Sequence, residues 1–447
     1  MTAMATYRTG VFAPGVPRPS SPLRAPGRLN IFIDPNQVTV INVGSMIDGT
    51  GAKPIEKAVV VVEGTKIKAV GQQGKISVPE GQHVQTLDFP NSHLLPGLMD
   101  SHTHLMFGVP GKSYEQVIES DTDEIMLLRS IGNALTHMKS GVTTMRENGA
   151  RNKITFNLRE GGNRGYVTIP RLLLCGRPVT MTGGHFFWCN QEADGVDAVR
   201  AAVRELVKDG ADHIKIMASG GGTAITSLLQ PSYTVEELTA IVDEAHNMGK
   251  PTTAHCHATQ SIANAVEAGV DMIEHLGFNE PDGSYKFYPH VVEKMAKKGT
   301  YLSPTVQTGY RGRESLLMKK EEQGKKFSKE DQVRLDWVAA KCENQLAFLG
   351  RAWSEFGVQP IAGTDAISGF GDYCIGLELM SDAGMSNMDI IQAATGTAAK
   401  AMHVEDLTGT VVPGLEADLI VVDNNPLENI KALRKMTMVM RGGERIV

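Results

Sequence analysis

Two histidines separated by one residue, His102 and His104, follow an apolar run formed by Leu94-Leu95 and Leu98-Met99. Such a run predicts a strand that is buried on both faces. Side chains two positions apart in a strand leave from the same face, so the two imidazoles converge where the strand ends. Neutral imidazoles bind zinc, manganese, iron or cobalt. A polar pair on a surface loop is the plain alternative, so the metal hypothesis needs support from elsewhere in the chain.

Lys215 lies inside a second apolar segment, Ile214-Lys215-Ile216-Met217. An unpaired ammonium is expensive to bury in such a strand. One solution is a buried ion pair. The other is carboxylation of the amine by carbon dioxide, which makes the lysine an anionic ligand that can bridge two metal ions. The histidines elsewhere in the chain favour the second solution.

Further polar residues end other apolar segments. His255 and His257 share one face of a predicted strand at 252–257, His275 follows 272–274, and Asp365 follows 360–364. Any one of these residues alone is more often a satisfied polar side chain than a ligand. Together they add imidazoles and a carboxylate, which first-row metals prefer.

Strands and helices alternate through the middle of the chain. The strands predicted besides the one before His102 are 142–146, 171–175, 213–217, 252–257, 272–275, 301–304 and 360–364. The predicted helices are 122–139, 197–208, 234–248, 261–268, 291–297, 330–355 and 388–402. This alternation predicts an α/β fold, a (β/α)8 TIM barrel with its active site at the carboxyl ends of the strands. An open doubly wound sheet is the alternative, and the lack of G-x-G-x-x-G after the first strand lowers it.

The flanking regions differ from the barrel. Residues 36–92 and 406–447 contain short β-branched runs and glycine turns, which predict a small β-sandwich domain built from both termini around a catalytic barrel at 93–405. Residues 1–35 are rich in proline, arginine and serine and are predicted to form a terminal arm. The Lys/Glu-rich segment 307–328 is predicted as a long solvated loop, with a lid as the alternative.

Composition narrows the partners. The 447 residues carry a formal net charge of −6 and no basic cluster, which argues against nucleic acid and anionic membranes. The apolar runs are too short to span a bilayer. Five scattered cysteines without a C-x-x-C pair predict reduced thiols and a cytoplasmic location.

From about residue 38 to residue 447 the chain resembles the metal-dependent amidohydrolase superfamily. The resemblance rests on Leu-Pro-Gly-Leu-Met-Asp-Ser-His-Thr-His at 95–104, Lys215, His255, His275, Gly-Thr-Asp at 363–365 and Gly-Leu-Glu-Ala-Asp-Leu-Ile-Val-Val-Asp at 414–423. Ile-Lys-Ile-Met-Ala-Ser-Gly-Gly at 214–221, Ala-His-Cys-His at 254–257 and Thr-Gly-Gly-His at 182–185 are similar to the branch of Xaa-Pro dipeptidases and ochratoxinase. Phenylurea and thiocarbamate herbicide hydrolases resemble the same branch.

The resemblance implies a centre of two divalent ions, with zinc expected first and manganese, iron or cobalt as alternatives. His102, His104 and Asp365 would hold one ion, His255 and His275 the other, and carboxylated Lys215 and a hydroxide would bridge them. Asp365 would also carry the proton from the hydroxide to the leaving nitrogen. His257 is assigned a role toward the substrate or the oxyanion. Relatives of this architecture commonly form homo-oligomers, which is expected here by analogy.

The substrate is predicted to be a small molecule that contacts His185, Tyr233 and Phe187. Two motifs depart from the peptidases: Arg-Glu-Asn-Gly stands at 146–149 where they usually have Arg-Asp-x-Gly, and Phe-Phe-Trp follows His185 where they tend to have a small residue and an acid. The aromatic residues favour an apolar or aromatic substrate, although core packing explains them equally well.

The main functional hypothesis is therefore a hydrolase that cleaves the C–N bond of an apolar or aromatic amide, a phenylurea-like urea or a carbamate. The alternative is a dipeptidase or N-acyl amino acid carboxypeptidase, including one for ochratoxin-like amides, which needs a group for the free carboxylate. Arg177 and Arg311 are the candidates for that group. A non-catalytic interaction protein on the same fold would show eroded ligands, and all six ligands are present.

Overall fold

The computed structural model describes residues 36–447 except 82 and 190, so the predicted arm at 1–35 lies outside the described residues. Its larger part is built on short buried strands that are hydrogen-bonded in the orders β5-β6-β7 and β10-β11-β12-β13. These strands are β5 Leu98–Thr103, β6 Val142–Glu147, β7 Arg171–Leu174, β10 Ile214–Met217, β11 Thr252–His255, β12 Met272–Glu274 and β13 Tyr301–Ser303. The neighbouring pairs within each group run parallel.

Residues 360–366 close the barrel as its eighth segment. The amide of Ile361 donates to the Leu302 carbonyl of β13 at 2.8 Å, and the amide of Asp365 donates to the His102 carbonyl of β5 at 2.8 Å. The two groups of strands are joined on their other side by β8 (Val179–Thr180), which follows β7 in the chain and pairs in parallel with β10. β8 also pairs in parallel with β9 (Gln191–Glu192). The predicted TIM barrel is thereby confirmed.

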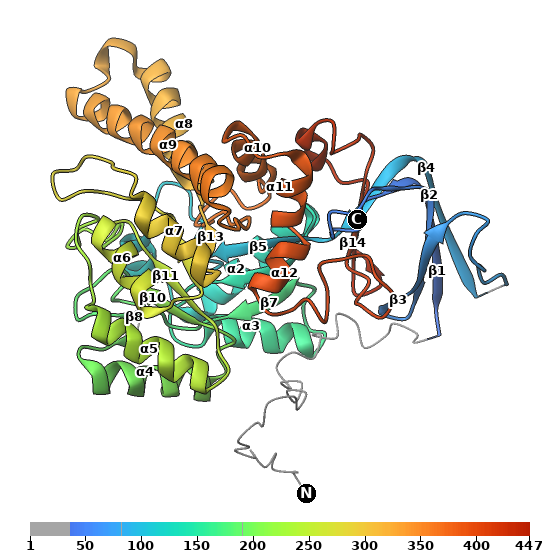
Figure 1. The fold of residues 1–447 in the computed structure, drawn as a ribbon, viewed down its shortest axis with the longest axis horizontal. Helices are drawn as coiled ribbons and strands as arrows, with labels where there is room; N and C mark the ends of the chain where they lie inside the picture. The colour runs from blue at the N-terminus through green and yellow to red at the C-terminus, as the bar shows by residue number, and fades with distance from the viewer. Residues whose placement is uncertain (1–35, 82, 190) are drawn as a thin grey trace, which may run out of the picture.

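Helices follow the strands and cover the barrel (Figure 1). They are α1 Tyr114–Ser120, α2 Asp123–Lys139, α3 Ile154–Asn163, α4 Val196–Asp209, α5 Val235–Asn247, α6 Thr259–Ala268, α7 Pro289–Lys298, α9 Lys329–Phe356, α10 Cys374–Asp382, α11 Asn387–Ala393 and α12 Gly396–Ala401. A capping box of Thr234 and Glu237 starts α5. The predicted helix at 388–402 is instead two helices, because the backbone of Thr395 is not helical, with φ −142° and ψ −101°.

The prediction of a loop at 307–328 is wrong. This segment forms helix α8, Val306–Gln323, and a short 3-10 turn, η2, at Gly324–Lys326. Leu316 of α8 packs with Leu335 and Val338 of α9, so a narrow apolar stripe inside a charged segment is enough to fix the helix. In Figure 1 the two helices form a hairpin that extends beyond the barrel.

The β-rich ends of the chain join in one seven-stranded sheet of order β16-β15-β14-β4-β1-β2-β3. The strands are β1 Val38–Met46, β2 Ile55–Glu63, β3 Lys66–Gln72, β4 Val84–Pro96, β14 Leu419–Val422, β15 Met438–Arg441 and β16 Glu444–Arg445, with a 3-10 turn, η3, at Ile430–Arg434. All seven strands are hydrogen-bonded in one continuous order, because β4 pairs with β1 on one side and with β14 on the other. Side chains of β1 and β2 share one apolar cluster with those of β14 and β15, as expected for the predicted β-sandwich.

Alternation along β14 shows how this sheet attaches to the barrel. Leu419 and Val421 belong to the apolar cluster of the sheet, whereas Ile420 and Val422 belong to the main cluster of the barrel. Successive side chains of a strand point to opposite faces, so one short strand contributes to both cores. The sheet therefore holds β4, and with it the start of β5 and His102, in place.

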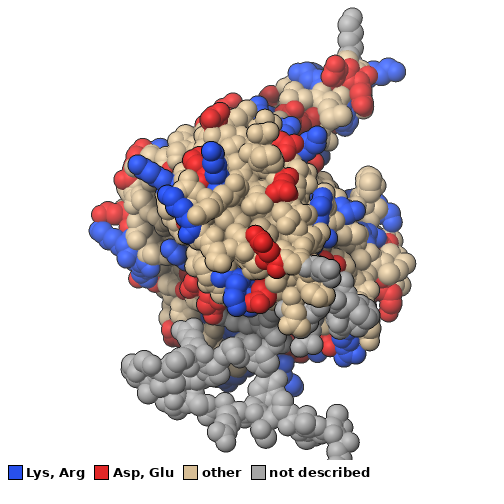
Figure 2. All heavy atoms as spheres, turned by 90° about the vertical axis from the view of Figure 1, so that its right-hand side faces the viewer, with Lys and Arg blue, Asp and Glu red and all other residues tan. Residues whose placement is uncertain are grey.

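Within the described residues, no helix combines the length and the apolar character that crossing a bilayer requires. Figure 2 shows the face on the sheet side, where acidic and basic side chains are interspersed and neither sign dominates. All five cysteines are free and buried.

Candidate metal centre

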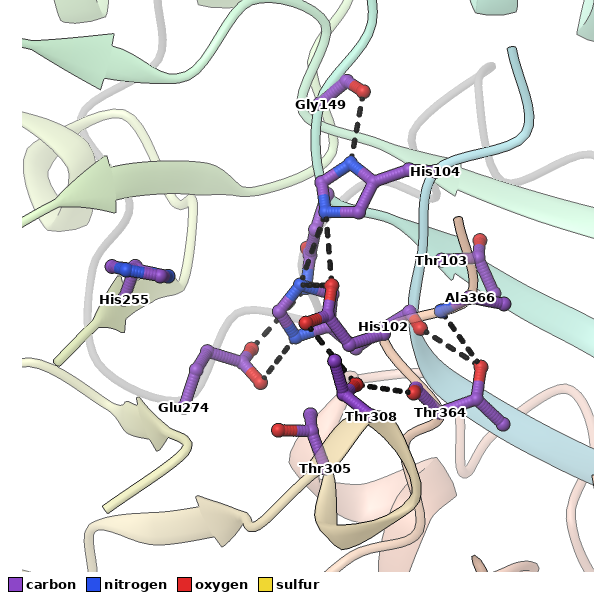
Figure 3. Close-up of polar contacts among 12 residues, drawn as sticks. His102, Thr103, His104, Gly149, His255, Glu274, Thr305, Thr308, Thr364 and Ala366 are labelled. Carbon is purple, nitrogen blue, oxygen red and sulfur yellow. Dashed lines mark hydrogen bonds and ion pairs between the residues drawn. The ribbon is translucent and has the colours of Figure 1, made fainter. Parts of the chain in front are cut away.

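The polar residues predicted at strand ends come together at the carboxyl end of the barrel. Figure 3 shows His102, His104 and His255 among them. Two groups have donor atoms close enough for a metal ion: His255, His257 and His275, and His102, His275 and Asp365, with the atoms of each group within 4.8 Å of one another. His275 belongs to both groups, so the two halves of the site are adjacent.

The first half has the spacing of a coordination sphere. The Nε2 atoms of His102 and His104 lie 3.3 Å apart, and each lies 3.3 Å from Oδ1 of Asp365. Ligand atoms about 2.1 Å from a tetrahedral zinc ion stand about 3.4 Å from one another. This triangle of two imidazole nitrogens and one carboxylate oxygen therefore fits a divalent ion without rearrangement.

Four histidines are held in defined orientations by their second ring nitrogens. In each case one nitrogen contacts an oxygen of the protein, which leaves the other nitrogen free to face the site. The contacts are His102 Nδ1 to Glu274 Oε2 at 2.8 Å, His104 Nδ1 to the Gly149 carbonyl at 3.1 Å, His255 Nε2 to the Gly220 carbonyl at 3.1 Å and His275 Nδ1 to Thr305 Oγ1 at 2.6 Å. Carbonyl and carboxylate oxygens only accept, so His102, His104 and His255 carry a proton on the bonded nitrogen and a lone pair on the other.

Lys215 lies fully buried between these groups, with its Nζ 3.5 Å from Nε2 of His102. None of the ion pairs formed by residues 36–447, leaving aside 82 and 190, involves Lys215. Burial lowers the pKa of its ammonium. The ion pair considered for Lys215 is therefore not found there, and a neutral amine is the form that reacts with carbon dioxide.

The second half of the site contains a close pair, because Nε2 of His275 is 2.8 Å from Nδ1 of His255. The ring of His257 stacks on that of His275 at 4.5 Å, and its buried Nδ1 has no hydrogen-bond partner among the described residues. Burial holds the pKa values of all three histidines well below 6.5, so they are neutral and able to bind a cation.

Asp365 and the histidines beside it set each other's charge. Burial alone would raise the pKa of Asp365, but His102, His104 and Lys215 hold it below its ordinary value. Burial lowers the pKa of His102. For His104 the hydrogen bond and charge of Asp365 outweigh burial and raise the pKa. Asp365 is therefore ionised at neutral pH and draws a cation, either a proton or a metal, into the triangle.

Backbone strain accompanies two of the candidate ligands. His275 has φ 72° and Asp365 has φ 51°, in the left-handed region that residues other than glycine rarely adopt. Both amides are fixed, His275 to the Ser303 carbonyl at 2.9 Å and Asp365 to the His102 carbonyl at 2.8 Å. Such strain clusters where side-chain direction matters for function, and here it turns both side chains into the site.

The site opens into a cavity of about 280 Å³. His185 lines it, with Nδ1 2.8 Å from Oγ1 of Thr223 and its ring against that of His255. Phe187 and Tyr233, which were predicted to contact the substrate, are not among its lining residues. The preceding residue, Phe186, lines the cavity instead, and the Tyr233 hydroxyl donates to the Ala193 carbonyl at 2.9 Å. The Tyr233 hydroxyl is thus bonded to the backbone, and its side chain lies outside the wall of this cavity.

Two residues of the site were missed from the sequence. Glu274 is fully buried and accepts from His102, Arg146 and Thr253, so it orients the first candidate ligand. A carboxylate inside the apolar strand Met-Ile-Glu was the available signal. Lys341 of α9 lines the cavity, and no motif in its helix marks it.

Comparisons with known proteins agree with this architecture. Residues 93–446 match the amidohydrolase family. Ochratoxinase from Aspergillus niger is 27% identical over 453 residues, covering 92% of this chain and 87% of its own, and its crystal structure matches with a TM-score of 0.78. A Xaa-Pro dipeptidase crystallised with methionine in its active site is 30% identical, with a TM-score of 0.80 and coverage of 91% of this chain and 99% of its own.

A more distant structure, phenylurea hydrolase B, has a TM-score of 0.74 at 20% identity, with coverage of 91% of this chain and 96% of its own, and shows the shared fold alone. The resemblance to the Xaa-Pro dipeptidase and ochratoxinase branch is confirmed by these matches. The match over residues 93–446 and the site that those residues build show that the chain belongs to the amidohydrolase family.

Proposed function

We propose that this protein hydrolyses the C–N bond of an amide, urea or carbamate that carries an apolar or aromatic group. The observation that carries the proposal is the set of four histidines that are each bonded through one ring nitrogen to the protein and directed through the other at a common site. Asp365 and the fully buried Lys215 complete that site. Imidazoles fixed in this way are typical of metal centres.

The proposed ligands divide between two divalent ions. His102, His104 and Asp365 would hold one, His255 and His275 would hold the other, and Lys215, once carboxylated by carbon dioxide, would supply an anionic ligand between them. Zinc suits this nitrogen and oxygen donor set, and manganese, iron and cobalt are the alternatives. Two bound ions would lower the pKa of a water molecule toward neutrality and polarise the substrate carbonyl.

Asp365 is the proposed acid–base residue. Its carboxylate is ionised at neutral pH and can accept the proton of the attacking water. The same carboxyl then delivers the proton to the leaving nitrogen, which is too basic to depart as an anion. The hydroxyl of Thr308, 3.4 Å from Oδ2, can orient the carboxyl during both transfers.

Apolar side chains around the cavity support an apolar or aromatic substrate group. The rings of Phe186 and Tyr114 lie 6.0 Å apart on one wall. Met217, Leu228 and Ile367 also line the cavity. A flat ring can stack on such a wall, whereas a strongly hydrated group gains little there.

A carboxylate-bearing amide, such as a dipeptide or an N-acyl amino acid, is the second candidate class. One observation favours it: Lys341, a cationic residue, also lines the cavity.

The expected homo-oligomer and cytoplasmic location remain predictions. Light scattering of the purified protein tests the first of them.

An assay of the metal-loaded protein tests the proposal. The panel contains phenylureas, N-aryl carbamates, N-acyl amino acids and Xaa-Pro dipeptides, with amine release as the readout. We expect hydrolysis of at least one class, its loss on chelation and its return when zinc, manganese or cobalt is added. The matched variant His102→Asn should lose both the metal and the activity. A fully loaded protein that hydrolyses no member of the panel would contradict the proposal.

A further inference from the structure

One face of α9 forms part of the cavity wall. Trp337, Lys341 and Gln345 line the cavity at intervals of four residues, the spacing that places side chains on the same side of a helix. The ammonium of Lys341 lies 5.8 Å from the centre of the Trp337 ring, a cation–π contact that keeps the lysine in the wall. A positive charge is therefore held in the cavity, on an element separate from the barrel strands.

Within the described residues this ammonium has no anionic partner. Among residues 36–447, with 82 and 190 set aside, the side chain of Lys341 forms neither a hydrogen bond nor an ion pair, and burial lowers its pKa. The other charged residues that line the cavity are Lys215 and Asp365, and the Asp365 carboxylate is engaged with His102 and His104. A partly desolvated cation with three unused donors gains more from an anionic ligand than an exposed lysine would.

His257 adds a second unused donor to the cavity. His257 and Lys341 line the same cavity. Nδ1 of His257 is buried without a partner in the described part of the chain. An imidazole N–H and an ammonium that face one cavity can each donate to an oxygen of one carboxylate.

The arginines expected to bind a carboxylate are engaged elsewhere. Arg177 pairs with Glu205 and Asp209 and is not among the residues that line the cavity. Arg311 donates to the carbonyls of Ser368 and Gly369 and lines a separate groove beside α8. Among the cavity-lining residues, Lys341 is then the cation left for this role, since Lys215 lies among the candidate metal ligands.

We propose that Lys341 and His257 bind a carboxylate of the substrate while the scissile carbonyl lies at the strand ends, so that the substrate is an N-acyl amino acid or a dipeptide-like amide. This inference rests on the proposed C–N hydrolysis and narrows its substrate class, from the neutral amides and ureas favoured by the sequence to anionic ones. The apolar wall of Phe186 and Tyr114 would then contact the aromatic part of the same substrate.

Two substrates that differ only in the carboxylate test the inference: N-benzoyl-L-phenylalanine and N-benzoyl-2-phenylethylamine. We expect the metal-loaded wild-type protein to prefer the first by about 10- to 100-fold in kcat/KM. Lys341→Met should reduce this preference by a similar factor, mainly through KM, and should keep the metal content of the wild type. Lys341→Arg should restore part of the preference. Lys329→Met removes an exposed lysine from the same helix and should leave the preference within about twofold.

Equilibrium binding gives a readout that does not need turnover. Calorimetry should show L-phenylalanine binding to the metal-loaded protein more tightly than 2-phenylethylamine, and Lys341→Met should weaken the first by about tenfold or more.

Each outcome decides between the two proposals. Equal kcat/KM for the two substrates in the wild type, or a preference unchanged in Lys341→Met, would overturn the role of Lys341 and leave C–N hydrolysis standing. Failure to hydrolyse any amide, urea or carbamate would overturn the proposed function, and calorimetry would still decide whether Lys341 binds a carboxylate.

Discussion

Two buried charged residues at opposite ends of the barrel, Asp418 and Lys215, differ in the partners that the chain gives them. Where the barrel meets the seven-stranded sheet, Asp418 is buried and its carboxylate accepts from Arg171 at 2.5 Å, from Thr408 at 2.8 Å and from the amide of Gly442 at 2.7 Å. At the other end, the mouth, Lys215 is buried just as fully and pairs with no carboxylate of the described chain, and the ring of His257 has a buried nitrogen without a partner.

This difference distinguishes buried charges that stabilise the fold from buried charges that await a bound ligand. A buried ion whose partners belong to the chain contributes to the fold, and removing one partner exposes the other to the full desolvation penalty. A buried ion that lacks such partners is stable only when something else supplies them. The mouth of this barrel thus has the character of a site completed by ligands, whereas at the junction the buried carboxylate of Asp418 finds its partners within the chain.

The largest effect should come from removing the buried lysine. Lys215→Met keeps the length of the side chain, and we expect kcat/KM to fall by at least about 10³-fold because the link between the two ions is lost. The free energy of unfolding of the metal-free protein should not decrease by more than about 1 kcal/mol, since no ion pair is broken. Steady-state kinetics and denaturant unfolding measure these two quantities, and metal analysis measures how much metal the variant binds. Metal content and activity equal to the wild type would contradict this role.

The junction should show the opposite pattern. Asp418→Asn leaves Arg171 buried without its charge partner and should lower the free energy of unfolding by about 3–5 kcal/mol. Because the change lies away from the mouth, kcat/KM of the folded protein should stay within about threefold of the wild type. Asp382→Asn, at an exposed position, is the matched control. If Asp418→Asn were stable but inactive, the proposed difference between the two regions would be contradicted.

A smaller effect is expected where a hydroxyl orients a candidate ligand. Thr305→Val removes the partner of Nδ1 of His275 and nearly keeps the shape of the side chain. Metal affinity, measured by competition with a chelator, should fall by about 10- to 100-fold. Thr305→Ser retains the hydroxyl and should behave as the wild type. Equal losses in both variants would indicate a packing effect instead of an orienting hydrogen bond.

The pH dependence of stability gives the smallest predicted effect. Burial lowers the pKa of His185 from 6.5 to about 3. Below pH 6.5 this histidine therefore binds a proton in the unfolded chain but not in the folded one. Stability is therefore lost as the pH falls from 6.5 toward 3, by about 2 kcal/mol at pH 5 for this one group. In His185→Gln the loss of unfolding free energy of the metal-free protein between pH 7 and pH 5 should be smaller by about that amount. An unchanged slope would show that His185 is not held neutral.

Strand-end chemistry is the part of the site that the sequence predicts well. Each candidate ligand follows or occupies a short apolar strand; these ligands are His102, His104, Lys215, His255, His275 and Asp365. A parallel barrel brings all such strand ends to one rim. Local pattern and one rule of architecture were enough to predict this convergence, because the strands themselves fix the positions of the residues.

Residues outside that rule could not be predicted. Lys341 reaches the cavity from α9, which packs against α8, and α8 was predicted as a loop from its charge. Phe186 lines the cavity and Phe187 does not, since the left-handed backbone of Phe186, φ 64°, directs its side chain inward. Such directions depend on tertiary contacts and single backbone angles that hydrophobic patterns do not report.

Anomalous X-ray diffraction from crystals of the zinc-loaded protein shows directly whether the barrel mouth holds two ions. We expect two strong peaks there, one within the triangle of His102, His104 and Asp365 and one against His255 and His275, with extra density joining Lys215 to both. An absence of peaks in protein that binds zinc in solution, or peaks only at surface residues, would contradict this expectation.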